Sequence, residues 1–307
     1  MAGIRVFIAS AAFVALCCGI ASAWGLRGHQ LLSGVAAAHF PPSLPAFLRT
    51  PQTARAIALL ATEPDLIKGR DDAALTAATS PEHYLDLDDD GSVAGIPLAS
   101  LPPTRPQYVA ELERRGVDPY KAGFLPYAIL EGYQRLAKDF ALYRAYVATG
   151  ERERAALRER IVVQDLGEFS HFVGDGSQPL HVTVHYNDGG AHAKFEEGVV
   201  ERYVTRAAVA GDLQPARLLA ANVLPSIERY LRETNAAYPQ VYALYRSGRF
   251  RSDAGPLAAR ELARGAGFLD DLVETAWVRS EDEQVGYPAV HVRDLESHAL
   301  PVSAFHE

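Results

Sequence analysis

The chain has 307 residues, of which 48% are hydrophobic and 22% are charged, and its formal net charge is −8. This length and composition allow one large domain or two small ones with a sizeable core, and they exclude a disordered chain, a collagen and a cysteine-rich scaffold. The 38 acidic residues against 30 basic ones also argue against an ordinary nucleic-acid-binding module, because such a module needs a basic face.

The first 23 residues have the features of a secretory signal peptide. Arg5 precedes an apolar run, Val6 to Ile20, that is too short for a comfortable membrane span. Ala21-Ser22-Ala23 has the small-x-small pattern of a cleavage site, so we expect a mature chain that starts at Trp24. An uncleaved anchor is the alternative. Cleavage removes both cysteines and any membrane anchor, and we therefore predict a secreted or periplasmic protein without disulfides.

The remaining sequence has the pattern of helices joined by loops. Apolar residues recur with the 3.6-residue period of a helix in six segments, which are Gly28–Phe40, Phe124–Thr149, Glu153–Gly174, Ala191–Ala207, Pro215–Tyr230 and Pro256–Val278. The alternation that is typical of strands is almost absent, and Pro and Gly gather between the helical segments. We predict an all-α fold, with one compact multi-helix domain over residues 24–280 and an irregular tail over residues 281–307.

One stretch has the spacing of metal ligands. His171 and Asp175 are four residues apart, so on a helix both side chains lie on the same face. Gly174, Gly176 and Pro179 then end the helix, and His181 can fold back towards the same place. Taken alone, a His/Asp pair at this spacing is more often a surface hydrogen bond than a metal site.

A second pair with the same spacing follows at His192 and Glu196. Imidazole nitrogen combined with carboxylate oxygen suits zinc, and a pair four residues apart supplies two ligands from one rigid element. Two such pairs with His181 between them are hard to explain as solvated helix faces. The sequence therefore favours a metal site over surface hydrogen bonds.

Two acidic segments upstream contain further candidate ligands, Asp65 and His83. Asp65 can also be read as a helix N-cap, and Asp88–Asp90 as a solvated loop. These three aspartates and Gly91 are not an EF-hand, because the spaced ligands and the distal Glu of that calcium loop are missing.

The predicted mature N-terminus adds a third kind of ligand. A free α-amine titrates near neutrality, so the amine of Trp24 can be neutral and can coordinate a metal together with the adjacent carbonyl. His29 follows five residues later. The structural alternative is a hydrophobic Trp that seals the start of a helix.

This ordered set resembles the trinuclear zinc phosphodiesterases, the superfamily that joins zinc-dependent phospholipases C with the fungal-type single-strand-specific nucleases. The resemblance runs from Trp24 to about Glu201, and its most specific part is His171-Phe-Val-Gly-Asp175 with Gln178-Pro-Leu-His181. It implies a compact helical domain with a zinc cluster at the bottom of a cleft.

The resemblance also implies how three zinc ions are held. The first is assigned to Asp65, His83, His171 and Asp175. The second is assigned to His181, His192 and Glu196. The third is assigned to the amine and carbonyl of Trp24 with His29, and it shares Asp175 as a bridge.

Three catalytic residues are predicted beside the cluster. Asp65 is expected to orient or deprotonate the attacking water, and Lys68 to contact a phosphate oxygen. Asp86 is expected to position Lys68 or a histidine. Three dications in one pocket would bind an anionic phosphodiester despite the negative net charge, would acidify a bound water and would stabilise charge on the phosphoryl group.

Two substrate classes compete, and we predict no obligate protein partner. Ten residues separate His181 from His192, and the motif ends at Glu196, which resembles phospholipases C and favours a phospholipid substrate. The opening Trp24-Gly-x-x-Gly-His29 resembles the nucleases, so single-stranded nucleic acid is the alternative. A non-catalytic zinc protein is the third possibility. Six aromatic residues can stack a base or line an acyl or choline site, and these are Tyr84, Phe124, Tyr127, Phe172, Tyr186 and Phe195.

Overall fold

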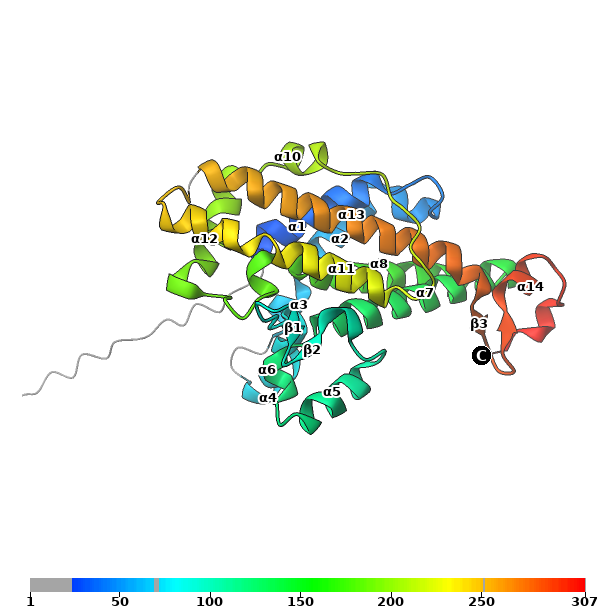
Figure 1. Cartoon of the computed structure of the whole chain (residues 1–307). Helices are drawn as coiled ribbons and strands as arrows, with labels where there is room; N and C mark the ends of the chain where they lie inside the picture. Colours follow the sequence, from blue (N-terminus) through cyan, green and yellow to red (C-terminus); the bar gives the residue numbers. More distant parts are fainter. Residues whose placement is uncertain (1–23, 69–71, 251, 307) are drawn as a thin grey trace, which may run out of the picture.

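The computed structural model describes residues 24–68, 72–250 and 252–306 (Figure 1). The predicted signal peptide lies outside these residues. The described chain is predominantly helical, and its strands form only two antiparallel hairpins of two-residue strands. The predicted all-α fold is thus confirmed. None of the described helices is long and apolar enough to cross a membrane.

Four long helices form the centre of the molecule, and they are α1 (Gly25–His39), α7 (Leu125–Thr149), α8 (Arg152–Asp175) and α13 (Gly255–Arg279). Helix α8 packs against α1, α7 and α13, and α13 packs against α1 and α7. Each helix presents a face of fully buried aliphatic residues, such as Leu32 of α1 and Leu269 of α13, to this core. The last turn of α8 therefore lies deep inside the protein, where solvent is excluded.

Shorter elements surround the four central helices. The remaining helices are α2 (Pro51–Leu60), α3 (Glu63–Leu66), α4 (Ala73–Thr79), α5 (Arg105–Arg114), α6 (Pro119–Ala122), α9 (Val200–Tyr203), α10 (Arg206–Gly211), α11 (Leu224–Asn235), α12 (Tyr238–Arg246) and α14 (Val292–Glu296). The strands are β1 (Ser92–Val93), β2 (Ile96–Pro97), β3 (Gln284–Val285) and β4 (Val290–His291). Helix α3 packs against α8, and α4 packs against the 3₁₀ turn Ser80–His83, so both lie on the side of the molecule where α8 ends (Figure 1).

Four of the six predicted helical segments match α1, α7, α8 and α13 to within a few residues. The continuous helix predicted over Ala191–Ala207 is wrong. A π-helix, Lys194–Val199, passes into α9, and the chain then becomes extended at Val204, which has φ −101° and ψ 129°. The Thr205 hydroxyl accepts a hydrogen bond from the Ala208 backbone amide and starts α10 as a separate helix.

The helix predicted over Pro215–Tyr230 is also wrong in its first half. The backbone amide of Arg217 donates to the Asp271 carboxylate at 2.6 Å, and that of Leu219 donates to the Thr275 hydroxyl at 2.9 Å. Because α13 satisfies these amides, the segment runs along α13 without forming a helix. Helix α11 begins only at Leu224.

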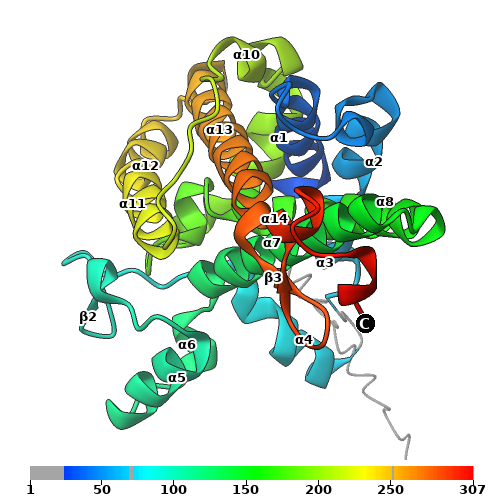
Figure 2. The same ribbon diagram turned by 90° about the vertical axis from the view of Figure 1, so that its right-hand side faces the viewer.

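The tail predicted to be irregular forms regular structure over its described residues. The β3–β4 hairpin and α14 fold onto α7 (Figure 2). A small second core contains Val285, Val292, Leu295 and Phe305, packed against residues of α7 that include Tyr146. The Phe305 and Tyr146 rings meet edge to face with centroids 5.7 Å apart. The segment is too short for its apolar spacing to predict that it packs against α7.

Candidate metal centre

The end of α8 supplies the centre of the site. His171 and Asp175 lie in its last turn, both with no exposed surface, and His171 Nε2 is 3.3 Å from Asp175 Oδ2. The Gly176 amide closes the helix on the Phe172 carbonyl at 3.0 Å. A tight turn through Gln178 then leads into the 3₁₀ segment Pro179–His181, which returns His181 towards Asp175 as predicted. His181 Nδ1 lies 4.0 Å from Asp175 Oδ1.

The four residues predicted for a first zinc ion converge on one point. His83 Nδ1 lies 2.9 Å from His171 Nε2 and 3.0 Å from Asp175 Oδ2. Asp65 Oδ1 lies 3.8 Å from the same His83 nitrogen and 3.9 Å from His171 Nε2. Ligand atoms about 2.0–2.1 Å from a tetrahedral ion lie about 3.3 Å from one another. The observed separations fall on both sides of that value.

The three residues predicted for a second zinc ion also meet. His181 Nε2 lies 3.2 Å from Glu196 Oε1, and His192 Nε2 contacts the same oxygen. Glu196 lies in the π-helix and has 1% exposure. The wide turn of this helix places its side chain towards the cluster, and π-turns are frequent at functional sites.

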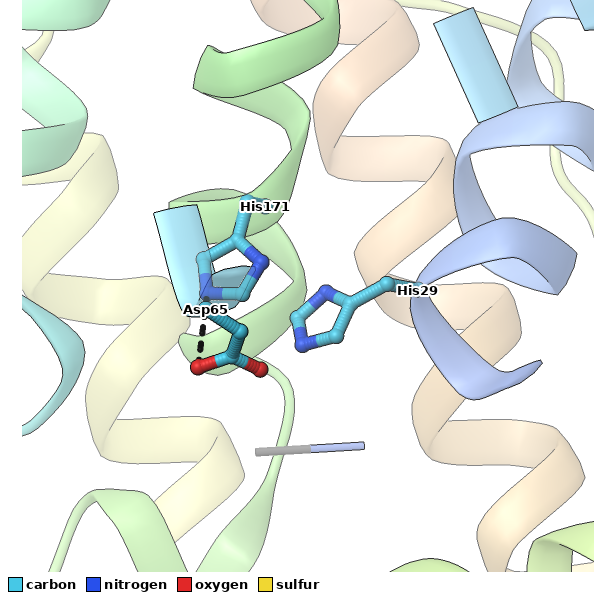
Figure 3. A group of neighbouring side chains, drawn as sticks. All are labelled: His29, Asp65 and His171. Atoms are coloured by element: carbon cyan, nitrogen blue, oxygen red, sulfur yellow. Dashed lines mark ion pairs between the residues drawn. The ribbon is translucent and has the colours of Figure 1, made fainter. Parts of the chain in front are cut away.

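The third predicted group lies at the start of α1. The Trp24 backbone nitrogen is 3.4 Å from His29 Nε2, which is also 3.4 Å from Asp175 Oδ1. The indole of Trp24 is fully buried and donates from Nε1 to the Ser177 hydroxyl at 2.8 Å. The His29 ring stacks on the His171 ring with centroids 3.9 Å apart, and the Asp65 carboxylate lies beside both rings (Figure 3).

The two oxygens of Asp175 face different neighbours. Oδ1 faces His29, whereas Oδ2 faces His83 and His171. This is the arrangement that a carboxylate bridging two metal ions needs. All nine predicted ligands thus lie in one buried, connected group, in which no residue is more than 5% exposed.

Further hydrogen bonds orient the ring nitrogens towards the group. His171 Nδ1 donates to the Ala61 carbonyl at 2.8 Å, and His181 Nδ1 donates to the His83 carbonyl at 2.6 Å, which leaves each Nε2 as the ligand atom. The fully buried Gln178 donates from Nε2 to Glu196 Oε1 at 2.7 Å. No role for Gln178 or Ala61 was predicted from the sequence. Gln178 lies inside the most specific motif, which was the only available signal.

Several polar atoms of the cluster have no hydrogen-bond partner although they are buried. They are His29 Nδ1, Asp175 Oδ1, His192 Nδ1 and Glu196 Oε2. Each unpaired buried polar atom lowers the stability of the fold by about 1–3 kcal/mol. Several such atoms in one place are therefore strongly destabilising unless something binds to them. Bound cations would satisfy Asp175 Oδ1, Glu196 Oε2 and a His192 nitrogen, so the residues present fit a metal cluster.

The protonation states of three histidines and of Asp65 favour metal binding. Burial, assisted by neighbouring charge, lowers the pKa of His29, and it lowers the pKa values of His83 and His192 to about 4, so these rings are neutral at pH 7. Burial raises the pKa of Asp65, but His171 and His29 outweigh it and lower that pKa to about 2. Burial raises the pKa of Glu196 to about 8. Only a nearby cation would hold this carboxylate ionised at neutral pH, since metal ligands must be deprotonated.

A pocket of about 450 Å³ opens onto the cluster. The ligands His83, His181 and His192 line its inner end, and Lys68 lies beside them with 7% exposure. Lys68 Nζ is 3.5 Å from Asp65 Oδ1. Lys68 thus lies in the pocket beside Asp65, and its contact with a phosphate oxygen stays a prediction.

The structure does not pair Asp86 with Lys68. Asp86 lines the same pocket, but no hydrogen bond or ion pair joins it to Lys68 or to a histidine in the described part of the chain. Burial, followed by the charge of Asp88, raises the pKa of Asp86 to about 6. Its predicted positioning role therefore has no contact to support it.

The six aromatic residues lie in three different environments. Tyr84 and Tyr186 line the pocket. Phe124, Tyr127 and Phe195 are buried in the main core. Phe172 is half-buried, and its ring centroid lies 5.4 Å from those of both His83 and His171.

Comparisons with known proteins are sparse. No protein-family model matches the sequence, and no curated protein matches it. Among solved structures, the chain is similar to the crystal structure of the alpha-toxin of Clostridium perfringens from avian strain SWCP. The TM-score is 0.43 and the sequences are 17% identical, over 87% of this chain and 68% of that chain.

Proposed function

We propose that this protein is an exported zinc-dependent phosphodiester hydrolase of the trinuclear superfamily, and that it acts as a phospholipase C. One observation carries the proposal. Buried candidate ligand atoms without hydrogen-bond partners are gathered around Asp175, and three residues of the same cluster, His83, His181 and His192, line a pocket that also contains Lys68. A non-catalytic zinc protein would not need an open pocket against its ligands.

In this proposal the chain's own residues have distinct tasks. The three ligand groups would hold three zinc ions, whose chemistry is to acidify a bound water and to neutralise charge on the phosphoryl oxygens. Asp65 would orient the attacking water and accept its proton. Lys68, at 3.5 Å from Asp65, would hold a phosphate oxygen in the pocket. The buried walls would exclude bulk water and strengthen both interactions.

Phospholipid is favoured over nucleic acid as the substrate. The short connection between His181 and His192 and the terminal Glu196 resemble phospholipases C. The nuclease alternative is supported by Tyr84 and Tyr186, because two aromatic rings in the pocket can stack on a base.

The experiment uses zinc-loaded protein that starts at Trp24. We expect hydrolysis of bis-nitrophenyl phosphate that a chelator abolishes and zinc restores. Parallel assays on phosphatidylcholine and on single-stranded DNA, with product identification, separate the two substrate classes. Diacylglycerol and phosphocholine are the expected products. Release of nucleotides alone would favour the nuclease, and zinc-loaded protein that is inactive on all three substrates would contradict a hydrolase.

A further inference from the structure

A second pocket lies at the opposite end of α1 from the metal centre. It has a volume of about 440 Å³, and its walls come from the end of α1, from α13 and from the segment between α10 and α11, which runs along α13 (Figure 2). A helix rises about 1.5 Å per residue, so His39 at this pocket lies about 15 Å along α1 from the candidate ligand His29. The pocket is therefore separate from the metal centre.

Asp270 is the unusual residue of this pocket. It lies on α13 with 2% exposure, and its Oδ1 is buried without a hydrogen-bond partner. No hydrogen bond or ion pair of this side chain is found among the described residues. Burial of a lone carboxylate is strongly unfavourable, and an unpartnered acid at the wall of a pocket is typical of a binding site. The proposed hydrolytic function makes no use of Asp270.

The pocket carries negative charge. Glu274 lies one helical turn beyond Asp270 and lines the same pocket, where its Oε1 accepts a hydrogen bond from the Ser43 hydroxyl at 2.8 Å. None of the described lysines or arginines lines the pocket. Helix α1 ends at His39, and the negative end of its dipole adds to this field. Burial, followed by the charges of Asp271 and Glu274, raises the pKa of Asp270 well above its usual range, and a cation in the pocket would offset this effect.

The walls indicate which kind of cation fits. A metal ion needs several ligand atoms close together, and the groups that meet this condition in the described part of the chain all belong to the metal centre. Much of the wall around Asp270 and Glu274 is apolar, through residues such as Pro41 and Leu213. An alkylammonium ion suits both features, because its N–H groups can donate to a carboxylate and its hydrocarbon chain can pack against apolar side chains.

We propose that this pocket binds a small primary alkylammonium ion, with the ammonium group on the Asp270 carboxylate and the alkyl chain against Pro41 and Leu213. Glu274 adds a second negative charge beside the ammonium group. A quaternary ammonium ion has no N–H group and would leave Asp270 Oδ1 unpaired, so it should bind more weakly. The inference does not depend on the proposed hydrolase function, because the two sites share no residue.

The test measures binding of n-butylammonium to the zinc-loaded protein by isothermal titration calorimetry. n-Butyltrimethylammonium keeps the charge and the chain but lacks N–H groups, and n-butanol keeps the chain but lacks the charge. Asp270→Asn keeps the size of the side chain and removes its charge. Asp271→Asn is the matched control, because it removes the same charge from the next residue, whose carboxylate accepts from the Arg217 amide at 2.6 Å and does not line this pocket.

We expect one n-butylammonium ion per chain, bound about tenfold or more weakly by Asp270→Asn. Asp271→Asn should stay within about threefold of the wild type, since its charge does not contact the ligand. Glu274→Gln, which keeps an acceptor for Ser43, should have an intermediate effect. On the wild type, n-butyltrimethylammonium should bind about tenfold more weakly than n-butylammonium, and n-butanol more weakly still.

Equal affinity of the wild type and Asp270→Asn for n-butylammonium would overturn the inference. So would equal affinity of the wild type for n-butylammonium and n-butanol, because the pocket would then be an apolar hollow only. The comparison of the three probes needs no variant, so the inference stays testable if Asp270→Asn does not fold.

The metal centre supplies a further check, because an amine can also coordinate zinc. Asp175→Asn should bind n-butylammonium within about twofold of the wild type, since distant sites act independently. Loss of binding in Asp175→Asn but not in Asp270→Asn would place the amine on the metal and overturn the inference. A wild-type protein that cleaves no diester but binds n-butylammonium through Asp270 would disprove the hydrolase and support this site.

Discussion

At the scale of single residues, Asp175 has the most contacts within the cluster. Its two oxygens face His29 on one side and His83 and His171 on the other. Burial raises its pKa, but His171 and the surrounding hydrogen bonds outweigh it and hold the pKa well below the usual range. The carboxylate is therefore charged, and its charge is available to balance two adjacent dications.

Asp175→Asn keeps the size of the side chain and removes this charge. We expect at least one zinc ion to be lost and the rate on bis-nitrophenyl phosphate to fall about a hundredfold or more, as when a main electrostatic stabiliser is removed. Glu196→Gln should be milder, because Glu196 belongs to one ligand group only. Kinetics and zinc content are measured on the same samples. A variant with near-normal rate and a full metal complement would show that Asp175 does not bridge.

The backbone nitrogen of Trp24, which is the N-terminal amine of the predicted mature chain, leads to a second prediction at this scale. It lies 3.4 Å from His29 Nε2, and the buried indole anchors it through Ser177. In a protein with one added Met before Trp24, this nitrogen is an amide, which cannot donate its lone pair in the same way. We expect loss of the zinc ion at His29 and of activity. Proteolytic exposure of Trp24 should restore both, and equal zinc content in the two forms would refute the role of the amine.

At the scale of elements, α8 approaches α1 through a glycine. A Cβ at Gly174 would lie 2.8 Å from His29 Nδ1, too close for the ring to keep its place. Gly to Ala inside a helix normally stabilises by about 0.5–1 kcal/mol. Here the gain should be lost, because the new methyl group displaces His29 from Asp175.

We therefore expect Gly174→Ala to reduce zinc content and to slow hydrolysis about tenfold to a hundredfold, since small misplacements of a catalytic group have effects of this size. Gly211→Ala is the control, because nothing lies within 4 Å of a Cβ at that helical position. Calorimetry and metal analysis compare the two variants. A Gly174→Ala protein with wild-type metal content would mean that His29 has room to shift.

The contact between α7 and α8 contains a titratable pair. Asp139 of α7 is buried, accepts a hydrogen bond from Arg158 at 2.7 Å and faces Asp165 of α8. Burial, followed by Asp165, raises the pKa of Asp139 to about 7, against the opposing effect of Arg158. Between its ordinary pKa and pH 7 the folded chain holds a proton that the unfolded chain releases. The free energy of unfolding should therefore fall as pH rises through this range.

Asp139→Asn should remove this part of the pH dependence. Between pH 5 and pH 8, we expect the free energy of unfolding of the wild type to fall by on the order of 1 kcal/mol more than that of the variant. This figure allows for solvent screening and for the opposing effect of Arg158. Urea unfolding at several pH values measures the difference. Glu153→Gln, on an exposed part of α8, is the control and should follow the wild type. If the free energy of unfolding changed with pH in the same way in all three proteins, the raised pKa of Asp139 would be disproved.

At the scale of the whole molecule, the cluster joins distant parts of the chain. Its ligands come from α1, α3, the 3₁₀ turn before Tyr84, α8 and the segment from His181 to Glu196. Without bound cations, the burial of Glu196 and the other polar groups is unfavourable, because they lose their contact with water. This desolvation opposes the packing of these elements. Metal binding should therefore contribute directly to the stability of the fold.

We expect exhaustive chelation to lower the melting temperature by on the order of 10 °C, and zinc readdition to restore it. Scanning calorimetry with metal analysis before and after treatment measures this. The Asp175→Asn protein, with fewer ions to lose, should show a smaller change. An unchanged melting curve after confirmed metal removal would contradict a structural contribution.

The amino-acid pattern was enough to predict the helical class, which the structure confirms, and it also predicted a ligand set, which stays a prediction. Helix periodicity depends on neighbouring residues, so α7, α8 and α13 were predictable from apolar spacing. The pairs His171 with Asp175 and His192 with Glu196 also depend on local geometry, because residues four apart share one side of a helix. The assignment of the other ligands came from the family resemblance, since no local rule relates Asp65 or His83 to α8.

How these parts meet depends on the packing of the whole chain. It placed the backbone amides of Arg217 and Leu219 on α13 in place of a helix, and it docked the C-terminal tail on α7. It placed Asp86 and Lys68 in one pocket, with no hydrogen bond between them among the described residues. It also gave Gln178 its hydrogen bond to Glu196. These outcomes depend on contacts between residues far apart in the chain, which are set by how whole helices pack and not by the sequence pattern of any one of them.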